Sequence, residues 1–213
     1  RVDLPSSVTT LDKSSFVDNV GITNGAVDVY TTNAAHKDFI ADAKSHKIVY
    51  FNPQELWTAN DFTYEGTSLT GFTQEGRAKA VLYRYTILPD KNLEGENITK
   101  IAKEAFIPNG YEFIKEEVIS PNGLNKVVLP KFLEIIEERA FQYNNLTTVE
   151  FPSTLTTLKQ QCFNGNKLQK LIIPDTIVNI EEGAFSTNKL TDVTLPSNIK
   201  VIPKGLFARN ITL

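Results

Sequence analysis

Four consecutive units of 22 residues, between residues 124 and 211, repeat one pattern of apolar residues, proline, phenylalanine and asparagine. The recurring residues are Pro130, Pro152, Pro174 and Pro196; Phe141, Phe163, Phe185 and Phe207; and Asn144, Asn166, Asn188 and Asn210. A fixed period of this length is typical of repeat architectures, in which neighbouring units together bury apolar faces that no unit buries alone.

Each unit carries the same local signals. Apolar residues alternate just before the proline, as at Leu171 and Ile173, which predicts a short half-buried strand. Pro174 ends that strand because proline has no N–H group to continue a ladder. An apolar pair spaced by three residues, such as Ile177 and Ile180, and a small residue before the phenylalanine then turn the chain back across the core.

The energetics of one unit require its neighbours. Its roughly six apolar side chains contribute about 1.5–3 kcal/mol each when buried. Ordering the backbone costs about 1–2 kcal/mol for each of its 22 residues, so an isolated unit is expected to be unfolded. The phenylalanines are therefore expected to form a hydrophobic spine through stacked units. The asparagine amides are expected to form a ladder that satisfies turn backbone groups in successive coils.

The pattern Leu-x-x-Val-x-Leu-Pro-x-x-Leu-x-x-Ile-x-x-x-Ala-Phe-x-x-Asn resembles the BspA-like leucine-rich repeat of bacterial surface proteins, over residues 124–213. The resemblance implies a β-rich leucine-rich repeat solenoid, horseshoe-like, with short helical or irregular return segments. A further copy is recognisable at residues 2–16, and a distorted one at 88–106. The distorted copy carries an insertion around residues 92–97, and a second insertion, residues 107–123, follows it.

Three segments are expected. Residues 1–51, with short strands at 27–30 and 48–51 around a helical stretch, resemble the strand–helix–strand end of a first repeat block. Residues 52–87 are expected to form a linker and cap, with a hairpin around residues 65–67 and a short helix from Gln74 to Arg84. Residues 88–213 form the second repeat block. Because no methionine is present, even at position 1, the chain is expected to be part of a longer protein.

Composition excludes several classes of function. With 22 Lys and Arg against 25 Asp and Glu, the net charge is −3, which gives no basic footprint for nucleic acid. No apolar run approaches the roughly 18–20 residues that cross a bilayer, so membrane insertion is not expected.

Residues that could support catalysis or metal binding are few. Cys162 stands in the column otherwise held by Ala140, Ala184 and Leu206, so a buried, inert thiol is expected. His36 and His46 are too few to build a metal site. Residues 90–95 imitate the start of a calcium loop, but the twelfth position is Ile101 rather than glutamate, which favours a polar turn. No enzymatic activity and no cofactor are therefore predicted for these 213 residues.

The outward positions of the predicted strands are the candidate partner-binding face. They lie in parallel columns if the units stack, and the two apolar residues, Val128 and Ile172, share one column with Glu150 and Thr194. The members are Lys126, Val128, Thr148, Glu150, Lys170, Ile172, Asp192 and Thr194. Val, Ile and Thr are also common on ordinary sheets, so the apolar members alone do not decide between a contact surface and a tolerant strand face.

The leading hypothesis is a non-enzymatic protein-binding or adhesion segment of a larger bacterial surface protein. Its localisation at the cell surface or cell wall follows from the resemblance, and its partner would be a host extracellular or serum protein. The alternative is a ligand-free spacer that presents other domains from the cell wall. A third possibility places an enzymatic domain elsewhere in the parent protein.

Overall fold

The structure, a computed structural model, describes residues 2–3, 27–31, 46–50, 56–114 and 117–211 and divides into two compact units, Arg1–Leu56 and Trp57–Leu213. In the first unit, β1 (Val2–Asp3), β2 (Val27–Thr31) and β3 (His46–Tyr50) form a parallel sheet in that order. The strands expected near 27–30 and 48–51 are thus present. The expected helix between them and most of the first repeat copy lie outside the described residues. The expected segment boundaries at residues 51 and 87 stay a prediction.

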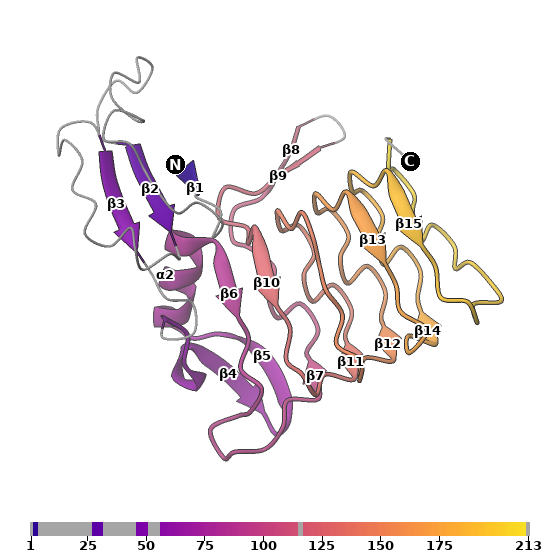
Figure 1. The fold of residues 1–213 in the computed structure, drawn as a ribbon, viewed down its shortest axis with the longest axis horizontal. Helices are drawn as coiled ribbons and strands as arrows, with labels where there is room; N and C mark the ends of the chain where they lie inside the picture. The colour runs from indigo at the N-terminus through magenta and orange to yellow at the C-terminus, as the bar shows by residue number, and fades with distance from the viewer. Residues whose placement is uncertain (1, 4–26, 32–45, 51–55, 115–116, 212–213) are drawn as a thin grey trace. The chain divides into compact units, whose positions relative to one another are not determined.

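The second unit is a stack of coils with one continuous sheet along one edge (Figure 1). Each of four coils contributes one short strand to it: β7 (Lys100–Ile101), β11 (Ile135–Ile136), β12 (Thr157–Leu158) and β14 (Asn179–Ile180). All neighbours among them are parallel, with Ile101, Ile136, Leu158 and Ile180 in one register column. The solenoid expected from the repeat is therefore confirmed.

This continuous sheet lies where the sequence predicted only a return segment. Each of its strands ends at the second residue of the apolar pair after the proline, such as Ile136 in the pair Leu133 and Ile136. A spacing of three gives no alternating pattern, so strand structure was not predicted there. The strands are only two residues long and depend on the parallel ladder between coils. In the last described coil Ile202, expected in the core, is half exposed and forms no strand.

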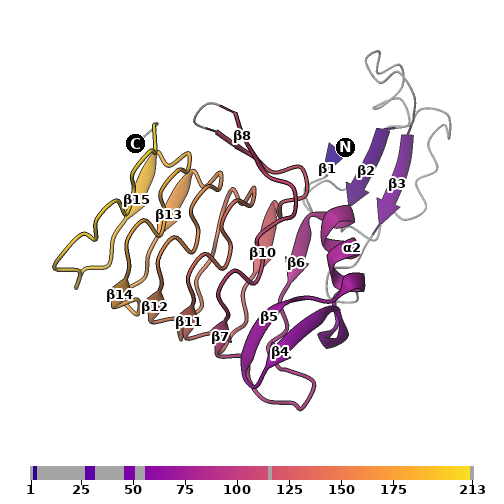
Figure 2. The same cartoon turned by 180° about the vertical axis from the view of Figure 1, so that it is seen from behind.

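The predicted strands before the prolines form a second row, which Figure 2 shows from behind. β6 (Tyr85–Ile87) pairs in parallel with β10 (Lys126–Val128), and β13 (Lys170–Ile172) pairs in parallel with β15 (Asp192–Thr194). Residues 148–150, predicted as the strand between these pairs, form none. The prediction of a strand in every unit is wrong at this coil.

We attribute the interruption to Phe151. The corresponding positions hold Leu129, Ile173 and Leu195, which are smaller. The Phe151 ring lies edge-on against the spine, with its centroid 5.9 Å from that of Phe163 and 6.3 Å from that of Phe185. A larger residue in a close-packed column displaces the backbone that carries it, and the ladder between β10 and β13 is lost.

The hairpin and helix expected between residues 52 and 87 are confirmed. After the 3₁₀ helix η2 (Ala59–Asp61), β4 (Phe62–Glu65) and β5 (Ser68–Phe72) form an antiparallel hairpin, and β5 pairs in parallel with β7 at the end of the continuous sheet. The helix α2 (Gln74–Tyr83) follows, with the Thr73 hydroxyl accepting from the Gly76 N–H. A Cβ on Gly76 would lie 1.9 Å from the Asp61 carbonyl oxygen, so glycine permits the close packing of α2 on η2.

The predicted phenylalanine spine runs through the stack. Successive rings of Phe106, Phe141, Phe163 and Phe185 are nearly parallel, with centroids 5.3, 5.2 and 5.8 Å apart. Phe72 of the cap extends the column, with its ring edge-on at 4.9 Å from Phe106, and Phe207 ends it. The cap and the coils therefore share one core.

The predicted asparagine ladder is also present. Asn166 shows the pattern: its Oδ1 accepts from the Leu146 N–H at 3.1 Å, and its Nδ2 donates to the carbonyls of Phe141 and Phe163 at 2.9 and 3.1 Å. Asn144, Asn188 and Asn210 make the equivalent bonds. Each buried amide thus connects the phenylalanine carbonyls of two consecutive coils.

The insertion at residues 107–123 leaves the stack as a second hairpin, β8 (Glu112–Ile114) and β9 (Glu117–Ile119), which are antiparallel. Both views show it projecting from the upper end of the coils (Figures 1 and 2). The distorted copy at 88–106 packs as a regular coil despite the two insertions, because Ile98, Ile101, Ala105 and Phe106 all lie in the core.

Candidate functional site

All eight residues of the candidate partner-binding face are exposed. The alternation that predicted them holds, because Val127, Leu129, Leu171 and Ile173 between and beside them are buried. Within the β13–β15 pair, Lys170 lies opposite Asp192 and Ile172 opposite Thr194. Ile172 is 70% exposed and Val128 39%. These are the two exposed large apolar side chains of the face.

The structure does not bring the eight residues into one continuous sheet. Lys170, Ile172, Asp192 and Thr194 share the β13–β15 pair. Lys126, Val128, Thr148 and Glu150 instead flank a groove of about 280 Å³, which opens where the ladder is interrupted between β10 and residues 148–152. The face therefore consists of a flat half and a grooved half.

The charges of this face are mixed. The face carries two lysines, Lys126 and Lys170, and two acidic residues, Glu150 and Asp192. The Lys126 ammonium lies 5.6 Å above the ring centre of Tyr85 on β6, within the range of a cation–π contact. Lys131, at the end of the groove, pairs with Asp90 at 3.0 Å. A surface with both signs of charge around two apolar side chains resembles the mixed composition of protein contact surfaces.

A second surface was missed by the sequence analysis. The β8–β9 hairpin places Tyr111 and Phe113 against Tyr143 of the neighbouring coil, with ring centroids 4.4 and 5.3 Å from that of Tyr143. Phe113 is 59% exposed. Burial raises the pKa of the Tyr143 hydroxyl above its ordinary value. One sequence signal pointed to this surface: the insertion of residues 107–123, which breaks the 22-residue period.

A groove of about 600 Å³ runs under this hairpin across four coils. Its walls and floor are formed by Phe113, Tyr143, Gln161, Asn164, Glu182, Gly183, Ser186, Thr187, Gly205, Ala208 and Arg209. The groove lies on the return side of the coils, away from the strand row that carries the candidate partner-binding face.

Comparison with known proteins assigns the repeats. Residues 112–213 match the family model described as "BspA type Leucine rich repeat region", in six copies. They are BspA-type leucine-rich repeats. No curated protein sequence is similar enough to the chain to count as a relative.

Two solved structures share the fold of these BspA-type repeats. The Leucine Rich Repeat protein of T. pallidum is 21% identical with a TM-score of 0.55, over 74% of this chain and 79% of that one. A leucine-rich repeat protein of Bacteroides ovatus is 22% identical with a TM-score of 0.50, over 71% of this chain and 43% of that one. At this identity the likeness concerns the fold alone.

The structure places several of the residues that were considered for catalysis or metal binding. Cys162 is fully buried in the stack, and burial raises the pKa of its thiol strongly. His36 lies outside the described residues. No group of three His, Cys, Asp or Glu side chains in the described part of the chain is arranged to hold a metal ion. Within the described ranges, no helix has the length and apolar character of a membrane span.

The calcium-like segment is a polar turn, as predicted. The Asn92 Oδ1 accepts from the N–H groups of Glu94 and Glu96 at 3.1 and 2.8 Å, and its Nδ2 donates to the Gly66 carbonyl. Asp90 accepts from the Lys131 N–H at 2.8 Å. Ile101, at the place where a calcium loop needs glutamate, is fully buried in the core.

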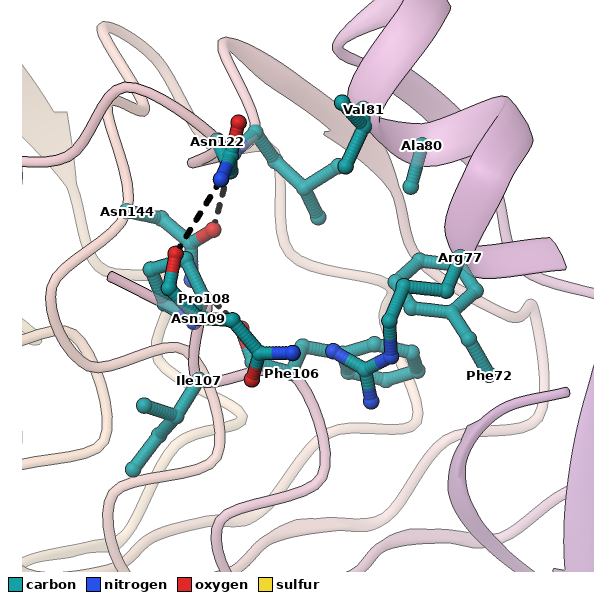
Figure 3. Close-up of a pocket in the computed structure, with 11 residues that line it drawn as sticks. Phe72, Arg77, Ala80, Val81, Phe106, Ile107, Pro108, Asn109, Asn122 and Asn144 are labelled. Atoms are coloured by element: carbon teal, nitrogen blue, oxygen red, sulfur yellow. Dashed lines mark hydrogen bonds between the residues drawn. The ribbon is translucent and has the colours of Figure 1, made fainter. Parts of the chain in front are cut away.

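A small cavity lies between α2 and the stem of the insertion (Figure 3). Phe72, Arg77 and Val81 line one side, and Phe106, Pro108 and Asn109 line the other. Its volume is about 100 Å³, well below the roughly 300–1,000 Å³ of ordinary ligand sites. The larger grooves on the surface of the stack are therefore better candidates for binding.

Proposed function

We propose that this chain is a protein-binding segment of a larger bacterial cell-surface protein and recognises its partner through the strand face. The observation that carries the proposal is the exposure of Ile172, 70%, among the polar neighbours Lys170, Asp192 and Thr194 on the β13–β15 pair. An exposed branched side chain ringed by polar groups is the arrangement of an interface anchor with its rim.

The rigidity of the stack supports this role. The spine and the asparagine ladder fix the coils, so the eight face residues are held in place before any partner arrives. Binding through a preformed surface avoids much of the ordering cost that flexible segments incur. Repeat solenoids commonly bind proteins across such extended surfaces.

The repeat family supports a location at the cell surface. BspA-type repeats favour attachment at the cell surface, and the partner is then a host extracellular or serum protein. Adhesion through this face is the resulting function. A ligand-free spacer has the same fold and differs only in having no partner.

The test measures binding of the chain to immobilised collagens, laminin, fibrinogen and serum albumin. The variant Val128→Glu/Ile172→Glu is expected to lose at least tenfold in affinity, because a carboxylate in an apolar contact is costly to desolvate. The matched control is Val178→Glu/Val201→Glu, which adds the same charge at two valines outside the face that are 71% and 76% exposed. Circular dichroism confirms that both variants fold.

Two results would overturn the proposal. Absence of saturable binding to every protein tested favours the spacer. Equal loss of binding in the face variant and in the control places the contact elsewhere on the molecule.

A further inference from the structure

The groove under the β8–β9 hairpin has one aromatic wall. Phe113 on β8 and Tyr143 on the coil contribute to it, and Tyr111 packs against both rings, edge-on to Phe113 at 6.1 Å. Three aromatic rings held together at the surface, with Phe113 largely exposed, present an apolar platform without a partner inside the described part of the chain. Exposed aromatic clusters of this kind mark binding surfaces.

The hairpin is fixed to the stack at several points, so the wall is preformed. Glu117 of β9 forms an ion pair with Lys189, two coils away. The Ser120 hydroxyl donates to the Tyr143 carbonyl, and the Asn145 Nδ2 donates to the Ser120 carbonyl at 2.6 Å. These contacts hold an insertion that the repeat itself does not need.

Gly165 makes room for the aromatic wall. A Cβ at this position would lie 2.5 Å from the Tyr143 ring and 3.3 Å from Val118 of β9. Its φ of +72° is also a conformation that favours glycine. The equivalent position in the next coil holds Thr187. Gly165 therefore allows Tyr143 and the hairpin to pack closely on this coil.

The floor of the groove is polar. The Gln161 Oε1 accepts from Arg139 at 3.2 Å, while its Nε2 has no partner among the described residues. The Arg209 guanidinium likewise has no ion pair within the described ranges, and Glu182 makes only a 3.5 Å contact with Lys204. The floor thus offers free donors from an amide and a guanidinium and an acceptor from a carboxylate.

Two glycines make the groove deep. At one position of its turn, each coil has a residue with a left-handed backbone. In four successive coils this residue is Arg139, Gln161, Gly183 and Gly205. The side chains that would fill the groove are therefore missing over the last two coils. The resulting volume of about 600 Å³ lies within the range of small-molecule sites.

We propose that this groove is a saccharide-binding site. A pyranose ring has an apolar C–H face that stacks on aromatic rings and hydroxyl groups that both donate and accept hydrogen bonds. The aromatic wall matches the first property, and the amide, guanidinium and carboxylate of the floor match the second. An apolar peptide side chain would leave these floor groups unpaired, so the polar floor favours a sugar over a peptide.

The experiment is saturation-transfer NMR and calorimetric titration of the full chain with three neutral tetrasaccharides: chitotetraose, maltotetraose and lacto-N-tetraose. We expect at least one of them to receive saturation and to bind with a measurable affinity. Phe113→Ala is expected to weaken that binding at least tenfold. The matched control is Phe132→Ala, which removes another exposed ring outside the groove and is expected to leave binding unchanged.

A second variant tests the groove without touching the hairpin. Gly205→Gln restores the residue type found at Gln161, which already adopts the same left-handed backbone. A Cβ at Gly205 meets only the Ala208 Cβ at 3.8 Å, so the fold is expected to tolerate the substitution. The added side chain fills the groove and is expected to abolish binding, whereas Val128→Glu/Ile172→Glu is expected to bind saccharide normally.

The outcomes separate cleanly. Binding of none of the three tetrasaccharides overturns the proposal, as does binding that survives both Phe113→Ala and Gly205→Gln. Phe113-dependent binding of a glycoprotein that persists after its glycans are removed enzymatically shows that the groove takes a peptide and also overturns it.

Discussion

At the scale of single residues, the asparagines hold the stack together through groups that water cannot reach. The amide of Asn166 bonds one backbone N–H and two phenylalanine carbonyls, from its own coil and the preceding coils. Buried backbone groups without partners cost about 1–3 kcal/mol each. Asparagine is suited to this position because one planar amide carries both an acceptor and two donors.

Replacing Asn166 by alanine is expected to destabilise the chain by about 3 kcal/mol, because three buried backbone groups lose their partner. Asn166→Asp keeps the acceptor but turns an oxygen toward the two carbonyls, so it is expected to be no better than alanine. Urea unfolding followed by circular dichroism measures both. Asn179→Ala, at an exposed position on β14, is the control and is expected to change little. A loss below about 1 kcal/mol for Asn166→Ala would contradict the ladder's role.

At the scale of elements, the interrupted strand row depends on one column of core residues. Leu129 and Ile173 permit regular strands at β10 and β13, whereas Phe151 between them does not. We attribute the groove on the candidate partner-binding face to this single large residue as well, since Lys126 and Glu150 flank the gap beside it.

Phe151→Ile, which copies Ile173, is expected to restore the missing strand at residues 148–150. The loss of aromatic contacts costs about 1 kcal/mol, and the new ladder bonds offset it at about 1 kcal/mol each. Hydrogen exchange measured by NMR is then expected to slow at least tenfold at the amides of 148–150. Phe132→Ile, at an exposed position, is the control. Unchanged exchange in Phe151→Ile would show that something other than this ring interrupts the ladder.

Many of the structural elements could be predicted from the 22-residue period of the sequence, and the exceptions have physical causes. The spine and the ladder were predictable because each is a column of one residue type. The continuous sheet was not, because two-residue strands depend on pairing between coils and leave no alternation in the sequence. The left-handed turn positions were also hidden, since Gln161 adopts φ of +55° where the next coil has Gly183 at +65°.

Of the two candidate sites, the strand face could be predicted from the sequence and the groove under the hairpin could not. The exposed positions of the strand face, such as Ile172, follow from alternation within one unit and could be predicted. The proposed saccharide groove combines an insertion with turns from four coils, up to about a hundred residues apart in the chain. Only its starting point, the break in period before Leu124, was visible in the sequence.

At the scale of the whole second unit, each coil packs on its two neighbours, so the first coil needs a cover. The cap supplies it twice: β5 pairs with the edge of β7, and Phe72 packs on Phe106. Asp61 and Lys79, 2.7 Å apart, fix the helix of the cap to η2. The cap is therefore part of the core rather than a separate module.

The fragment 57–213, which contains the whole second unit, is expected to fold cooperatively by itself. The shorter fragment 88–213 loses β4, β5, β6 and α2, which exposes the edge of β7 and the ring of Phe106. The loss of two or three buried large side chains is expected to lower the free energy of unfolding by about 5 kcal/mol, and the free edge favours aggregation. Urea unfolding and light scattering of the two fragments measure these effects. If 88–213 unfolds at the same urea concentration as 57–213 and stays monomeric, the coils are stable without a cover and the cap has another purpose.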